Sequence, residues 1–122
     1  MKYTRFQSPF LILFENAELM NVYQSEQGKH NYYGVLKVDS EKLKMLNDFL
    51  KKYNIYKFNN NIIKFKFPTH YGRPKYKAIG INGLPTVASV IECGIVDCKI
   101  KIEGVIDNKD VVLQCDTLIM KT

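Results

Sequence analysis

The chain has 122 residues, of which 46% are hydrophobic and 25% are charged, and its formal net charge is +6 at pH 7. This size and composition predict one folded domain covering residues 1–122 and argue against a disordered chain. A basic protein favours acidic partners, such as nucleic acid, an anionic membrane surface or an acidic protein. No apolar run approaches the ~20 residues that a membrane-spanning helix needs, so we expect no membrane insertion.

Strands are expected first along the chain. Apolar residues within 9–14 and 17–23 predict either one long bent strand or two strands, separated by Glu15 and Asn16. A polar loop containing Gly28 follows. The next strand is expected at 32–38, which is rich in aromatic and β-branched residues.

One helix is expected, from Glu41 to Tyr53. Asp39 or Ser40 provides a side-chain oxygen that can accept from the free N–H groups of the first turn. The apolar residues of this segment recur at helical spacing; they are Leu43, Leu46, Phe49, Leu50 and Tyr53.

The segment 62–67 alternates strictly and predicts a half-buried strand. Phe65 and Phe67 share one face with Ile63, so we expect them in the core, whereas Lys64 and Lys66 face solvent.

The C-terminal half is expected to consist of further strands. A short strand is expected at 75–81, and 86–93 is β-branched and apolar. The segments 94–105 and 111–120 predict a hairpin around the polar turn 107–110. The whole pattern predicts a mainly β fold with one helix, as a small antiparallel OB-like barrel or a twisted sheet.

The positive charge is concentrated in one block of the sequence. Residues 49–91 include eight Lys or Arg and no Asp or Glu. Cations beside aromatic rings suit a single-stranded nucleic acid, because cations bind phosphates and rings stack on bases. A strand whose lysines simply face water is the other interpretation. The predicted nucleic-acid-binding residues are Lys64, Lys66, His70, Tyr71, Arg73, Lys75, Tyr76 and Lys77.

Part of this block is expected to be an irregular loop, Thr69 to Pro74, because it contains Gly72 and is flanked by prolines. Such a loop presents side chains that the core does not need. Tyr71 and Tyr76 are therefore the expected base-stacking residues. Tyr32 or Tyr33 is a further candidate, because adjacent residues of a strand point to opposite faces and one of the two rings faces outward.

No motif predicts catalysis, a metal site or a cofactor. The cysteines form no CxxC pair, the histidines form no HxxxH pair, and the acids lack the paired spacing of a metal nuclease. We therefore expect no enzyme, metal or cofactor. Cys98 and Cys115 occupy core-like positions, and an odd number of cysteines fits a reducing, intracellular compartment.

The order of elements resembles that of phage-type OB-fold single-stranded DNA-binding proteins. The resemblance rests on the early strand 9–14, the strand 32–38 that leads into the helix, and the C-terminal strands 93–100 and 111–120. It implies a barrel that binds single-stranded DNA during replication or recombination, in the cytoplasm of a host cell. The chain departs from the family pattern in two ways: it ends on Lys121 and Thr122 instead of an acidic tail, and its helix follows two strands unless the first strand is split.

Two functions stay open from the sequence. The first is a non-enzymatic binder of single-stranded DNA, or of RNA, that assists replication, recombination or repair without reading sequence. The second is a small protein-interaction or inhibitor module that docks an acidic partner or mimics occupancy of a nucleic-acid site. A long edge strand in the C-terminal hairpin would also allow pairing with a second copy, so a homo-oligomer is open as well.

Overall fold

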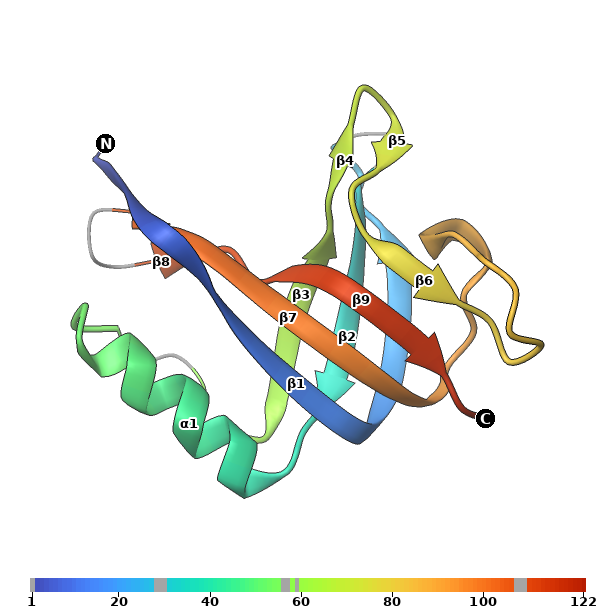
Figure 1. The fold of residues 1–122 in the computed structure, drawn as a ribbon, viewed down its shortest axis with the longest axis horizontal. Helices are drawn as coiled ribbons and strands as arrows, with labels where there is room; N and C mark the ends of the chain where they lie inside the picture. Colours follow the sequence, from blue (N-terminus) through green and yellow to red (C-terminus); the bar gives the residue numbers. More distant parts are fainter. Residues whose placement is uncertain (1, 28–30, 56–57, 59, 107–109) are drawn as a thin grey trace.

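Five strands close into a barrel, and the remaining elements decorate it (Figure 1). The computed structural model describes residues 2–27, 31–55, 58, 60–106 and 110–122. The barrel strands are β1 (Tyr3–Gln24), β2 (Tyr32–Lys37), β3 (Ile62–Phe67), β7 (Gly94–Ile106) and β9 (Gln114–Met120).

The barrel is closed by the one parallel pair among its five strands, β3 and β9. β1 pairs antiparallel with β2 and β7, β2 with β3, and β7 with β9. β3 and β9 pair in parallel at Lys66 and Gln114, where the Lys66 amide donates to the Leu113 carbonyl at 2.8 Å. The prediction of a mainly β, OB-like barrel with one helix is confirmed, although the barrel is mixed because β3 and β9 run in the same direction.

β1 is one long bent strand. Of the two expected alternatives, one bent strand or two separate strands, the first is confirmed. β1 pairs with β7 along its first part and with β2 along its last part. Its register with β7 shifts between Phe14 and Ala17, and Asn16 has a φ of 51° there. The Asn16 amide donates to Asp97 Oδ1 at 2.9 Å, and Lys121 Nζ donates to Asn16 Oδ1 at 2.8 Å. This bulge bends β1, so that the one strand can pair with both β7 and β2.

The barrel interior is filled by alternate side chains of its strands. On β3, Phe65 and Phe67 are buried and Lys64 is exposed, as the alternation predicted. Gly34 of β2 lies directly against Phe65, because a Cβ atom built on Gly34 would lie 2.3 Å from Phe65 Cζ. The Phe65 ring therefore occupies the space that a side chain at position 34 would need.

The helix α1 (Ser40–Lys51) connects β2 to β3. Asp39 caps it, and its Oδ1 accepts from the Lys42 amide at 2.7 Å. Phe49 of α1 stacks on Phe10 of β1, with ring centroids 3.9 Å apart and planes 6° apart. In the described part of the chain, no helix is long and apolar enough to cross a membrane.

Short strands complete the fold: β4 (Thr69–His70), β5 (Arg73–Pro74), β6 (Lys77–Ile79) and β8 (Asp110–Val111). The segment 86–93 contains a short 3-10 helix, Ala88–Val90, and no strand. Most of the predicted turn at 107–110 lies outside the described residues.

The structure corrects the expectation of an edge strand in the C-terminal hairpin. β7 pairs with β1 on one side and with β9 on the other. β9 pairs with β7 on one side and with β3 and then β6 on the other. β7 and β9 therefore each have a strand partner on both sides.

Candidate nucleic-acid interface

One row of outward side chains crosses the barrel from strand to strand. Tyr23 of β1 pairs in register with Tyr33 of β2, which pairs with Lys66 of β3. Lys66 pairs with Gln114 of β9, which pairs with Lys101 of β7. Because the five strands close into a barrel and β7 also pairs with β1, this row runs round the barrel from Tyr23 to Lys101, in steps of ~4.8 Å between neighbouring strands. We call these five residues the cross-strand row.

Two tyrosines and a lysine form a compact cluster at one end of the row. The rings of Tyr23 and Tyr33 lie 5.8 Å apart, with planes 23° apart. Lys64 Nζ lies 5.5 Å from the Tyr23 ring centroid and 4.7 Å from that of Tyr33. A hydrogen bond with Tyr23 raises the pKa of Lys64 above its usual value of 10.5, so Lys64 is a cation at neutral pH. The cluster offers aromatic faces and a positive charge together.

A small hairpin projects from the barrel where β3 ends, and Figure 1 shows it standing clear of the sheet. In this hairpin Thr69 pairs with Pro74 and His70 pairs with Arg73. The segment predicted as an irregular loop is thus a β-hairpin with a two-residue turn. Tyr71 and Gly72 form the turn with φ values of 50° and 77°, the positive pair typical of a type I′ turn.

A polar cavity of about 470 Å³ lies between the hairpin and the outer face of β7. Lys75 and His70 contribute to one side of it and Lys101 to the other. Glu103 Oε1 lies 3.2 Å from Lys101 Nζ and partly balances this charge. The cavity adjoins the row, because Lys101 and Gln114 belong to both. Its full lining is Pro68, Thr69, His70, Lys75, Lys101, Glu103 and Gln114.

The predicted site residues lie on β3, on the hairpin that follows it and on the segment that leads into β6. Lys64 and Lys66 alternate on β3 with the buried residues Ile63, Phe65 and Phe67; Lys64 is exposed and Lys66 is half-buried. His70, Tyr71 and Arg73 belong to the hairpin and are exposed. Lys75 follows the hairpin, and Lys77 begins β6 beside β9; both are exposed.

Tyr76 has a different environment from the other predicted residues. Its ring packs against Phe67 at 5.1 Å, and its hydroxyl accepts from the Ala88 amide at 2.8 Å. Burial raises the pKa of the Tyr76 phenol above its usual value of 10.0. This geometry gives Tyr76 a packing role and leaves Tyr71 as the exposed ring of the hairpin.

Sequence reasoning missed four residues of this surface: Tyr23, Lys99, Lys101 and Gln114. Tyr23 lies in the first strand and stacks beside Tyr33. Lys99 and Lys101 lie on the outer face of β7, where Lys99 pairs with Thr117 and Thr117 pairs with Lys77. Along β7 half-exposed residues such as Lys99 and Lys101 alternate with buried ones, and strand pairing brings these two lysines beside the basic block.

Two of the three cysteines lie in the core, and Cys93 is exposed. Cys98 and Cys115 are fully buried, as their core-like positions predicted. A hydrogen bond with Cys115 and burial raise the pKa of the Cys98 thiol well above its usual value, so it is neutral at physiological pH. Among the described residues, no group of three or more His, Cys, Asp or Glu is placed to hold a metal ion.

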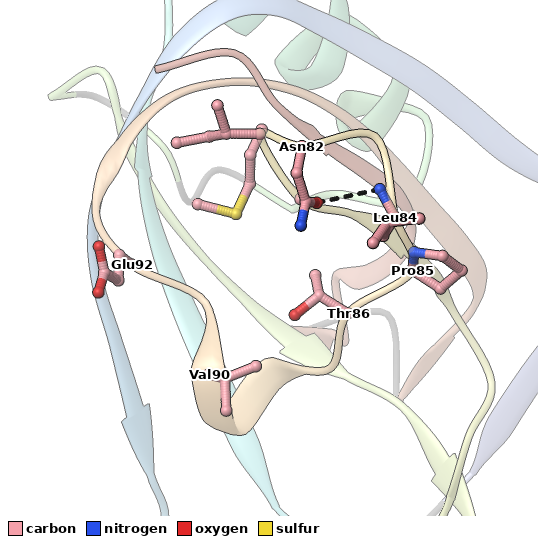
Figure 2. A pocket seen from close by; sticks show the side chains of 9 residues that line it. Asn82, Leu84, Pro85, Thr86, Val90 and Glu92 are labelled. Atoms are coloured by element: carbon pink, nitrogen blue, oxygen red, sulfur yellow. Dashed lines mark hydrogen bonds between the residues drawn. The ribbon is translucent and has the colours of Figure 1, made fainter.

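A second cavity, of about 420 Å³, has a different character (Figure 2). It lies beside the turn after β6, where Asn82 Oδ1 accepts from the Leu84 amide at 3.0 Å. Ile81, Leu84 and Val90 line it and are largely exposed. Its lining contains Glu92 and no basic residue, so it does not extend the basic surface.

Comparison of the chain with protein-family models, with curated proteins and with solved structures finds no match.

Proposed function

We propose that this protein binds single-stranded nucleic acid, DNA or RNA, without reading its sequence. The observation that carries the proposal is the part of the cross-strand row on β1, β2 and β3, which places Tyr23, Tyr33 and Lys66 side by side, followed by Gln114 and Lys101 farther round the barrel. Single-stranded nucleic acid requires this combination, because rings stack on bases of any identity and cations bind the backbone. The strand face and adjoining loops of an OB barrel are a common place for such binding.

The charges beside the row strengthen the proposal. Lys64 lies over both tyrosine rings, and the hairpin adds Arg73 and Lys75. Within the described part of the chain, neither Arg73 nor Lys75 forms an ion pair, so each is free to bind a phosphate. Each neutralised phosphate contributes ~0.7 to the slope of log affinity against log salt for a single strand.

A fluorescence-anisotropy titration tests this function. The probe is a labelled DNA oligonucleotide of ~16 nucleotides, the upper site size of one OB domain. We expect binding at low salt that weakens steeply as salt rises, with several unrelated base sequences bound equally. An RNA of the same sequence and a blunt duplex complete the comparison. Absence of binding to both single strands at low salt would sink the proposal.

An acidic protein partner is the second candidate, because the unpaired cations of the hairpin suit carboxylates as well as phosphates. In this role the protein would be a small interaction or inhibitor module. A pull-down after nuclease treatment separates the two functions. The second candidate is favoured if a partner protein is still recovered in stoichiometric amount after nuclease treatment and is no longer recovered with the Arg73→Glu variant.

A further inference from the structure

The tip of the hairpin places a large aromatic ring where the backbone favours glycine or asparagine. Tyr71 has a φ of 50°, a left-handed conformation that is unfavourable for a bulky side chain. Its side chain is 94% exposed, so no core packing compensates for this conformation. Backbone strain at an exposed position is commonly associated with function.

The hairpin that carries this ring is stiff. Pro68 and Pro74 fix the backbone at its two ends, and Pro68 is buried in the barrel. The Lys75 amide donates to the Pro68 carbonyl at 2.8 Å and closes the base of the hairpin. His70 contacts Tyr71 edge to face, with ring centroids 4.4 Å apart. The Tyr71 ring is therefore held out from the barrel with little freedom to fold back.

The hairpin also stands at one side of the cross-strand row. It continues directly from β3, which carries Lys66 of the row. Lys75 at the base of the hairpin and Gln114, the row neighbour of Lys66, line the same cavity. A single strand bound at this cavity would have the exposed Tyr71 ring of the hairpin tip beyond it.

We propose that the hairpin acts as a wedge at the junction between single-stranded and double-stranded nucleic acid. Tyr71 stacks on the end of the duplex and takes the place of the first base pair, while Arg73 and Lys75 hold the phosphates of the separated strands. This inference rests on the proposed single-strand binding. A stacked aromatic ring contributes a free energy comparable to that of one base-pair step, so one ring suffices to open about one pair.

The test uses a forked DNA with 2-aminopurine, whose fluorescence rises when it unstacks, in the first base pair of the duplex. Wild-type protein, Tyr71→Phe and Tyr71→Gly are each added to saturation, as judged by anisotropy. We expect wild type and Tyr71→Phe to raise the fluorescence several-fold and Tyr71→Gly to leave it at the level of DNA alone. The same probe placed deep in the duplex should stay dark with every variant.

Tyr71→Gly suits this test because glycine adopts the left-handed turn without strain, so the hairpin is retained. We expect its thermal unfolding midpoint to equal or exceed that of wild type. Equal junction fluorescence with Tyr71→Gly and wild type would overturn the wedge. If wild type binds single strands and does not open the junction, the wedge alone fails. If wild type binds no single strand, the proposed function fails with it.

Discussion

Lys66 of β3 and Gln114 of β9 lie side by side at the parallel step that closes the barrel. This pairing links the tyrosines of β1 and β2 to Lys101 of β7, because Lys66 also pairs with Tyr33 and Gln114 also pairs with Lys101. Barrel closure and the continuity of the cross-strand row thus depend on the same contact.

Lys66→Gln should weaken single-strand binding and lower its salt dependence. The substitution removes one charge from the middle of the row, and the backbone hydrogen bond of Lys66 to Leu113 does not involve the side chain. We expect the slope of log affinity against log salt to fall by ~0.7, the contribution of one phosphate. Lys44→Gln is the matched control, because Lys44 is exposed on α1, away from the row. If the slope of log affinity against log salt were the same for Lys66→Gln and Lys44→Gln, Lys66 would not bind a phosphate.

Tyr33→Ala should lower single-strand affinity at every salt concentration. Removal of a ring that stacks on a base costs ~1–3 kcal/mol of binding free energy. Tyr33→Phe keeps the ring face and should retain wild-type affinity. Anisotropy titrations of both variants check this, with circular dichroism to verify folding. The stacking role would be contradicted if alanine and phenylalanine gave the same affinity.

Part of this surface was accessible from sequence, because some of its features are local. The alternation of 62–67 placed Phe65 inside and Lys64 outside, and Asp39 marked the start of the helix. The row was not accessible, because it depends on the register between strands that are far apart in the chain. Tyr23 and Lys101 become neighbours of Lys66 only through Tyr33 and Gln114.

The hairpin and Tyr76 were hard to predict for a different reason. A two-residue turn with positive φ normally contains Asn-Gly or Asp-Gly, and this chain uses Tyr71 and Gly72. Tyr76 lies among lysines in sequence, but the Ala88 amide and Phe67 ring that contact it come from other elements. Composition gave no indication of either arrangement.

Gly34→Ala should destabilise the barrel strongly. The added methyl group would lie 2.3 Å from Phe65 Cζ, and Phe65 is buried, so its ring has little room to move. We expect the free energy of unfolding to fall by ~1–3 kcal/mol, the usual cost of overpacking. Urea-induced unfolding of the wild type and the variant measures this difference in the free energy of unfolding.

The double variant Gly34→Ala with Phe65→Leu provides the control for this prediction. The smaller leucine side chain leaves space for the new methyl group, so the double variant should lose less stability than the sum of the two single variants. Additive losses would show that the two positions do not interact.

Asn16→Ala should destabilise the bend in β1 more than Asn16→Gly does. Alanine at a φ of 51° is strained and loses the hydrogen bond from Lys121 Nζ, whereas glycine loses only that hydrogen bond. The expected loss for alanine is ~1–2 kcal/mol of unfolding free energy, the cost of the left-handed conformation. Asn21→Ala, at an exposed position of the same strand with no positive φ, should change stability little. A larger loss for glycine than for alanine in urea unfolding would contradict this account of the bulge.

The most direct test of single-strand binding along the row is an NMR titration of the labelled protein with a short single-stranded DNA at low salt. We predict that the backbone amide signals of the row and of the hairpin 69–74 shift with a common affinity, while those around Ile81, Leu84 and Val90 stay in place. No shift at the row, or shifts confined to the cavity beside Leu84, would contradict the account. The row residues to follow are Tyr23, Tyr33, Lys66, Gln114 and Lys101.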